Sequence, residues 1–383
     1  MQAFWFGVIA VLWAGFFLLE GFDFGVGVLY PFVGRDAESR AVAYRSIGPV
    51  WDGNEVWLLV AGGATFAAFP AWYASMFSGF YLAFALLLAG LIIRGIGLEY
   101  RGKVTTDRAR WWCDLGFVAG SAIPALLLGV AFADIVRGVQ LDADGTMTNS
   151  FVSLLNPYAL LGGVVTLTLF AFHGAVFLGL RTTGPVRHRA RDAARMLAPI
   201  VALAAVAFAA WTMTIRGGWV SIVLAFVVVV AFLGAVAGIL RERDGWAFTL
   251  SAVTVALVPV WLFSALWPDV LPARNNAAFS LTVHNASSTH HTLAVMTGVA
   301  LVMTPIVLAY QIWTYWVFRA RVTGEDVRLP AGPARLVESA RHSLSELTGQ
   351  AEPTGQAPHR FPATTVHRDP AGDGKPTRTH SAP

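Results

Sequence analysis

The chain has 383 residues, of which 56% are hydrophobic and only 13% are charged. Average soluble domains carry about 25% charged residues, so this composition excludes a soluble globular protein. The formal net charge of +4 does not indicate a nucleic-acid partner, because the basic residues lie beside long apolar runs, where the positive-inside rule explains them. A single cysteine, Cys113, excludes an internal disulfide and a CxxC metal or redox site.

Apolar runs of about 20 residues, the length that crosses the hydrocarbon core of a bilayer, predict an all-α bundle of about nine transmembrane helices. These runs cover residues 4–32, 47–69, 72–93, 111–136, 156–180, 196–215, 219–240, 246–267 and 292–318. No basic segment and no small-residue cleavage site accompany the first run. It is therefore expected to be a membrane helix and not a cleaved signal peptide.

The arginines and lysines predict the orientation of the bundle. Fifteen of them follow the first, third, fifth and seventh runs, namely Arg35, Arg40, Arg45, Arg94, Arg101, Lys103, Arg108, Arg110, Arg181, Arg187, Arg189, Arg191, Arg195, Arg241 and Arg243. The opposite side has only Arg137, Arg216 and Arg274. The positive-inside rule then places the amino terminus outside and the carboxyl terminus in the cytoplasm.

The composition changes after Arg321. The remaining residues are rich in Pro, Gly, Ala, Ser, Thr, His and Arg and have no apolar period. We therefore expect a transmembrane domain over residues 1–321 and a disordered cytoplasmic tail over residues 322–383.

Four acids fall within the first two predicted spans. Glu20 and Asp23 are three residues apart, as are Asp52 and Glu55, so each pair lies on one helix face. Carboxylates are costly in hydrocarbon and usually mark a water-filled path, a proton relay or a partner charge. The four acids therefore predict a proton path that opens to the cytoplasm. The alternative is that they fix helix packing through hydrogen bonds, with Asn54 as one available partner.

Weaker candidates for accessory roles are His173, Asp114, Glu99 and Trp57. Asp114 and Glu99 lie on the side of the acids, and Trp57 is placed either to anchor a helix at the interface or to contact a quinone ring. Only His173 lies inside a span, so the chain cannot supply the two transmembrane histidines that would hold a haem. No metal site is predicted, and the metal centres of any redox complex are expected on another chain.

The acidic segments resemble subunit II of the cytochrome bd quinol oxidases. The similarity lies in EGFDFGVGVL from Glu20, GPVWDGNEVWL from Gly48, AGGATFAAFP from Ala61, RGIGLEYR from Arg94, LNPYALLGG from Leu155 and FHGA from Phe172. It extends from the first span to about Val327. One departure is local, since His284 and Asn285 stand where related sequences have Trp-Asp, so a role for an acid there is not expected.

The resemblance implies a pseudo-symmetric heterodimer in the bacterial inner membrane. Subunit I would bind two b-type haems and one d-type haem, and small single-span subunits, membrane lipid and a structurally bound quinone are further expected partners. The complex would oxidise quinol and reduce dioxygen to water, with protons taken from the cytoplasm. In such a complex this chain would not be catalytic alone. The resemblance assigns Asp52 to the proton path, with Glu20 and Asp23 beside it.

Two other functions fit the same acids. In a proton-coupled secondary transporter, Glu20, Asp23 and Asp52 would bind the coupling ion, but such carriers commonly have inverted repeats, and no clear repeat relates the halves of this sequence. In a purely structural assembly partner, Asp52 would be dispensable. A carrier would work when purified alone, whereas an oxidase subunit would not.

Overall fold

The computed structural model describes residues 1–328, and most of them are helical. The long helices are α1 (Gln2–Val33), α3 (Trp51–Ala68), α5 (Tyr81–Tyr100), α6 (Asp107–Arg137), α8 (Pro157–Arg181), α9 (Gly184–Arg216), α10 (Trp219–Leu240), α11 (Asp244–Leu266) and α12 (His290–Val317). The short elements are α2 (Ala37–Ile47), α4 (Pro70–Gly79), α7 (Phe151–Leu154), α13 (Gly324–Arg328), the 3-10 helix η1 (Ala277–Phe279) and the antiparallel strands β1 (Asp269–Leu271) and β2 (Leu281–Thr282).

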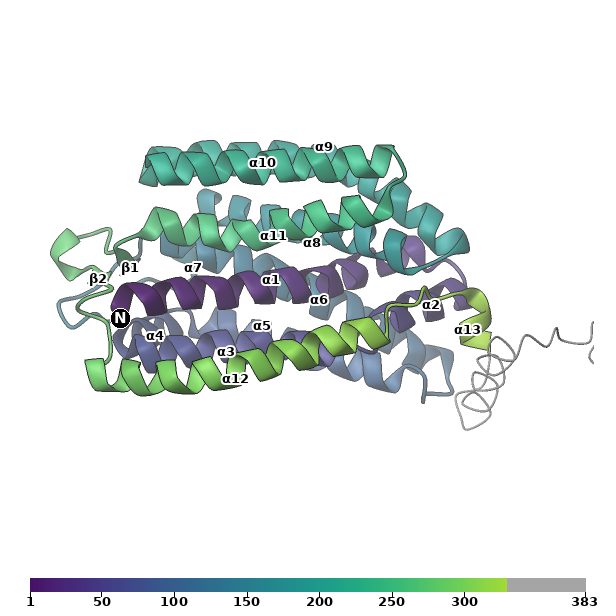
Figure 1. The fold of residues 1–383 in the computed structure, drawn as a ribbon, viewed down its shortest axis with the longest axis horizontal. Coiled ribbons are helices and arrows are strands. Elements are labelled where there is room, and N and C mark those ends of the chain that lie inside the picture. Colours follow the sequence, from purple (N-terminus) through teal and green to yellow (C-terminus); the bar gives the residue numbers. More distant parts are fainter. Residues whose placement is uncertain (329–383) are drawn as a thin grey trace, which may run out of the picture. The chain divides into compact units, whose positions relative to one another are not determined.

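The long helices run side by side, so the bundle has two ends (Figure 1). One end carries the amino terminus, β1, β2, α4 and α7, and the other carries α2 and α13. We call these the amino-terminal end and the α2 end. Helix α1 packs against α3, α6, α8 and α11, and its aromatic residues Phe16, Phe17, Phe22 and Phe24 are buried. Helix α1 is therefore the centre of the core.

The all-α membrane fold predicted from the apolar runs is confirmed. Within residues 1–328, eight helices are long and apolar enough to cross a bilayer, and they include every long helix except α3. Helix α3 forms where the second span was predicted, but it has only 18 residues. Asp52, Asn54 and Glu55 lie in its first two turns, so α3 has no 18-residue stretch as apolar as those of the other long helices.

The run predicted as one span over residues 72–93 instead forms α4 and then α5, which begins at Tyr81. Two further predicted boundaries are wrong, and both of these errors involve arginines. Helix α5 continues to Tyr100, so Arg94 lies inside a helix and not in the loop that was expected after residue 93. Helix α9 begins at Gly184 and not at residue 196, so Arg187 and Arg191 are also helical. In both cases the charge is matched by nearby acids, which removes the energetic reason for the helix to end there.

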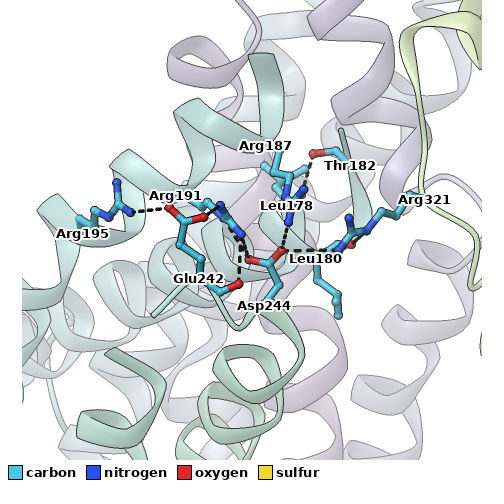
Figure 2. Close-up of polar contacts among 9 residues, drawn as sticks. All are labelled: Leu178, Leu180, Thr182, Arg187, Arg191, Arg195, Glu242, Asp244 and Arg321. Atoms are coloured by element: carbon cyan, nitrogen blue, oxygen red, sulfur yellow. Dashed lines mark hydrogen bonds and ion pairs between the residues drawn. The ribbon is translucent and has the colours of Figure 1, made fainter. Parts of the chain in front are cut away.

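Asp244 holds four segments together at the α2 end (Figure 2). Its carboxylate accepts hydrogen bonds from Arg187 at 2.6 Å and from Arg191 at 2.8 and 3.0 Å, and it lies 3.5 Å from Arg321. Arg321 also donates to the Leu180 carbonyl oxygen at 3.0 Å. The turn before α11 is thereby fixed to α8, to α9 and to the segment after α12.

The described chain stays ordered past the predicted domain boundary at residue 321. Val322 forms a bridge with Thr182, and α13 follows, with the Asp326 carbonyl oxygen accepting a hydrogen bond from Arg45 at 2.6 Å. The boundary was therefore placed too early. The rest of the predicted tail, residues 329–383, lies outside the described residues.

Helices α1 and α8 approach most closely at Gly25 and Gly174. A Cβ added to Gly25 would overlap the Phe170 carbonyl oxygen and lie 2.8 Å from the Gly174 Cα, and backbone cannot move aside as a flexible side chain can. We expect Gly25→Ala to destabilise the protein by about 1–3 kcal/mol, the usual cost of overpacking. Thermal unfolding of the purified protein checks this. The control is Gly7→Ala, where no atom lies within 4 Å of the added Cβ. Equal unfolding midpoints for the two variants would contradict the close approach.

Candidate functional site

Two acidic side chains contact one buried arginine in the interior of the bundle, and a third acid lies nearby. Arg94 of α5 forms an ion pair with Glu20 of α1, and its second terminal nitrogen lies 3.3 Å from Glu55 of α3. Glu20, Asp23 and Arg94 are completely buried, whereas the Glu55 side chain is 22% exposed. We call Glu20, Asp23, Glu55 and Arg94 the acid cluster.

Aromatic rings hold the guanidinium of Arg94 in place. The Phe24 ring centre lies 4.8 Å from the Arg94 Cζ, and the Trp51 ring centre lies 6.0 Å from it. Phe24 is one helical turn after Glu20 on α1, so one helix supplies both an ion-pair partner and a ring. The local sequence EGFDF therefore builds half of the binding site for this arginine.

Asp23 joins the cluster to helix α12 through Asn54. The Asn54 amide nitrogen donates to Asp23 Oδ2 at 2.7 Å and to the Leu19 carbonyl oxygen at 3.3 Å. The Asn54 amide oxygen accepts hydrogen bonds from the Tyr315 hydroxyl at 2.8 Å and from the Gln311 amide at 3.1 Å. The Asn54 side chain thus donates two hydrogen bonds and accepts two, so the orientation of its amide is fixed.

The acid cluster has more negative than positive groups. Full ionisation of Glu20, Asp23 and Glu55 against Arg94 would leave two uncompensated negative charges. Within the described residues, Glu20 Oε2 and Asp23 Oδ1 are buried with no hydrogen-bond partner. Such an arrangement is costly for fixed charges but suits groups that exchange protons.

Asp52, the acid that the WDGN motif singles out, lies on the surface of this chain. It occupies the first turn of α3 and is exposed, and within residues 1–328 its carboxylate has no hydrogen bond or ion pair. Glu55 lies one turn further along the same face and contacts Arg94. The four predicted acids therefore differ in burial: Asp52 is exposed, Glu55 is partly buried, and Glu20 and Asp23 are completely buried.

His173 is not part of the acid cluster. Its Nε2 lies 3.2 Å from the Leu18 carbonyl oxygen, to which it donates, and its Nδ1 lies 2.9 Å from Ser251 Oγ. The ring is completely buried and stacks on Phe248 with the centres 5.3 Å apart. Both nitrogens are engaged in joining α8 to α1 and α11, which is a packing arrangement.

Asp114 and Glu99 also lie apart from the cluster. Asp114 accepts a hydrogen bond from Tyr30 at 2.7 Å and pairs with Arg101 at 2.5 Å and with Arg40 at 3.4 Å. Glu99 is exposed and pairs with Lys103 at 3.5 Å. Asp114 thus fastens the α2 ends of α1, α5 and α6, and Glu99 belongs to a surface pair.

Trp57 lines an apolar pocket beside the acid cluster. The pocket lies between α1, α3 and α12 and has a volume of about 630 Å3. Gly53 and Gln311 also line it, and the Gln311 amide donates to Asn54. The pocket is therefore separated from Asp23 by two polar side chains.

Three partners of the acids were not predicted from the sequence, namely Arg94, Gln311 and Tyr315. The pairing of Arg94 could have been predicted, because an arginine that directly follows Leu-Ile-Ile in an apolar run needs an acidic partner, and the chain has buried carboxylates. The pairings of Gln311 and Tyr315 could not, since more than 250 residues separate them from Asn54.

Comparisons with known proteins agree with the motifs. A family model described as cytochrome bd terminal oxidase subunit II matches residues 1–318. The chain is 44% identical over 331 residues to cytochrome bd ubiquinol oxidase subunit 2 of Bacillus subtilis (strain 168), covering 84% of this chain and 97% of that protein. It is 37% identical over 361 residues to cytochrome bd-I ubiquinol oxidase subunit 2 of Escherichia coli (strain K12), covering 84% and 95%.

A solved structure has the same fold. The bd oxidase from Geobacillus thermodenitrificans contains a chain that superposes with a TM-score of 0.68 at 17% identity, covering 82% of this chain and 98% of that one. The family match, the sequence identities and the membrane-spanning helices support one assignment. The chain belongs to the family of cytochrome bd terminal oxidase subunit II, and it is a multi-pass bacterial inner-membrane component of an oxidoreductase complex.

Proposed function

We propose that this chain carries protons from the cytoplasm into a quinol oxidase complex that reduces dioxygen to water. The observation that carries the proposal is the acid cluster, in which Glu20 and Glu55 contact Arg94, Asp23 lies close enough to feel its charge, and the exposed Asp52 follows on α3. A structural role would need only as many acids as there are basic partners. The excess of carboxyl groups favours a role in which protons are bound and released.

The route that the contacts support runs from Asp52 to Glu55 and on to Glu20. Asp52 and Glu55 are one helical turn apart on α3, and Arg94 contacts both Glu55 and Glu20. The positive charge of Arg94 stabilises whichever neighbouring carboxylate has lost its proton. In this scheme the α2 end faces the cytoplasm and the amino terminus lies outside.

The one buried histidine of residues 1–328 does not suit a haem. Among the histidines of residues 1–328 only His173 is buried, and both of its ring nitrogens already have hydrogen-bond partners. A haem iron needs an axial ligand with a free nitrogen or sulfur atom. We therefore place the two b-type haems and the d-type haem in subunit I, which this chain would stabilise as its heterodimer partner.

The apolar pocket beside Trp57 fits a quinone in size and polarity. A volume of about 630 Å3 lies within the range for small-molecule sites, and Gln311 supplies a polar group in an otherwise apolar wall. Trp57 and Gln311 would hold the ring, and the bound quinone would serve to fill the space between α3 and α12. Chromatography of an organic extract of the purified complex tests this. We expect the extract to contain quinone, and an extract without quinone would contradict the proposal.

The proton path is tested by Asp52→Asn in the assembled complex. We expect oxygen consumption with quinol to slow by about tenfold or more, because proton transfer by a positioned side chain contributes two orders of magnitude or more to many enzymes. Reduced-minus-oxidised haem spectra should remain unchanged. Asp144→Asn is the matched control, since Asp144 is also exposed but lies in the loop between α6 and α7. Wild-type turnover in the Asp52→Asn complex would show that Asp52 is dispensable.

The isolated chain separates the oxidase subunit from a proton-coupled transporter. We expect the chain reconstituted alone in liposomes to move no protons in response to a substrate gradient. The family match and the relatives named as oxidase subunits favour the oxidase. Proton-coupled uptake by the isolated chain would favour the transporter instead.

A further inference from the structure

Arg137 and Arg274 line one cavity at the amino-terminal end of the bundle. The cavity has a volume of about 200 Å3, and its lining includes Asp134, Arg137, Asn149, Asn156 and Arg274. Within residues 1–328, neither guanidinium forms a salt bridge or a side-chain hydrogen bond. Arg216 at the same end differs, because it pairs with Asp269 at 3.1 Å and donates to the Val136 carbonyl oxygen.

The backbone brings the two arginines together. Arg137 ends α6, and Arg274 lies in the loop after β1. The Val139 N–H donates to the Pro272 carbonyl oxygen at 2.9 Å, and the Arg274 N–H donates to the Val139 carbonyl oxygen at 2.7 Å. Two like charges held beside one cavity repel each other, and a bound anion would offset that repulsion.

Asp134 adds an acceptor to the same cavity. It is only 2% exposed, and its Oδ1 accepts a hydrogen bond from Asn156 at 2.6 Å. Its Oδ2 is buried and has no hydrogen-bond partner among the described residues. With two arginines and one aspartate, the lining has a net positive charge and one unsatisfied acceptor. A matching ligand therefore carries both an oxyanion and an O–H or N–H donor.

We propose that this cavity binds a phosphate group that carries such a donor. The oxyanion would accept hydrogen bonds from Arg137 and Arg274, and the donor would reach Asp134 Oδ2. Asn156 caps the amino terminus of α8, where the helix dipole adds to the attraction. A plain carboxylate matches less well because it has no donor. Inorganic phosphate and a phospholipid headgroup with a hydroxyl group share the required chemistry.

The test follows modification of the arginines by phenylglyoxal in the purified wild-type complex, read by peptide mass spectrometry. We expect Arg137 and Arg274 to be protected either by inorganic phosphate in detergent or by nanodiscs of phosphatidylglycerol. The first result identifies free phosphate, and the second identifies a lipid headgroup. Nanodiscs of phosphatidylcholine, whose headgroup has no O–H or N–H donor, should not protect. Arg241, which is exposed at the α2 end, is the internal control.

A second measurement uses variants. The double variant Arg137→Gln/Arg274→Gln should weaken binding of the protecting ligand by about tenfold or more in calorimetry, because charge-assisted hydrogen bonds are lost. The variant Arg241→Gln changes one charge at the other end and should bind as the wild type does. The proposal would be overturned if neither phosphate nor phosphatidylglycerol protected Arg137 and Arg274. It would also be overturned if phosphatidylcholine protected them as well as phosphatidylglycerol does.

Discussion

Replacing Arg94 by methionine is expected to destabilise the assembled complex by about 3–5 kcal/mol, the usual cost of removing one partner from a buried ion pair. Methionine keeps much of the side-chain volume, so the loss is one of charge and not of packing. Glu20 is completely buried, and Arg94 is its ion-pair partner in the described structure. Without Arg94, Glu20 must either remain ionised in an apolar setting or take up a proton.

The measurement is the midpoint of thermal unfolding, together with the yield of complex judged from its haem spectrum. Lys103→Met serves as the control, since it breaks the exposed pair with Glu99 and should cost well under 1 kcal/mol. The double variant Arg94→Met/Glu20→Gln should regain part of the lost stability, because the uncompensated charge is gone. An Arg94→Met complex as stable as the wild type would contradict the ion pair.

Replacing Glu20 by glutamine is expected to lower the turnover of the complex by about a hundredfold, the low end of what a positioned proton-transfer group contributes. Glutamine still accepts a hydrogen bond from Arg94, but it cannot bind and release a proton. The effect should exceed that of Asp52→Asn, because solvent around the exposed Asp52 can compensate in part for the lost carboxylate, whereas Glu20 is completely buried.

The control for this prediction is Glu20→Asp, which keeps an ionisable group and should retain much more activity than Glu20→Gln. Turnover per haem is measured with excess quinol, and the unfolding midpoint is recorded for each variant. If Glu20 only anchored Arg94, Glu20→Gln would lower the unfolding midpoint while turnover per assembled complex stayed near the wild-type rate. That result would assign Glu20 to packing.

The sequence identified the acids better than their surroundings. Glu20, Asp23, Asp52 and Glu55 stand out because carboxylates are rare in apolar helices, and that rule holds without knowledge of the fold. Asn54 was also named as one available hydrogen-bond partner of the acids, since it lies between two of them in sequence, and the acid it bonds is Asp23. Both inferences needed only the local sequence.

The partners of the acids could not be predicted in the same way. Arg94 was assigned to a loop because the apolar window ended at the first charge, yet Glu20 and Glu55 neutralise that charge inside the bundle. Tyr315 reaches Asn54 from α12 because of tertiary packing. Likewise, no local pattern indicated that Arg137 and Arg274 would line one cavity.

The most direct test of the proton path is the rate of proton uptake by the purified complex as reduced enzyme reacts with dioxygen, followed with a pH-indicating dye. The path predicts that Asp52→Asn slows proton uptake in the same proportion as turnover, while the first electron-transfer step between the haems keeps its wild-type rate. Proton uptake at the wild-type rate in the Asp52→Asn complex would contradict the path.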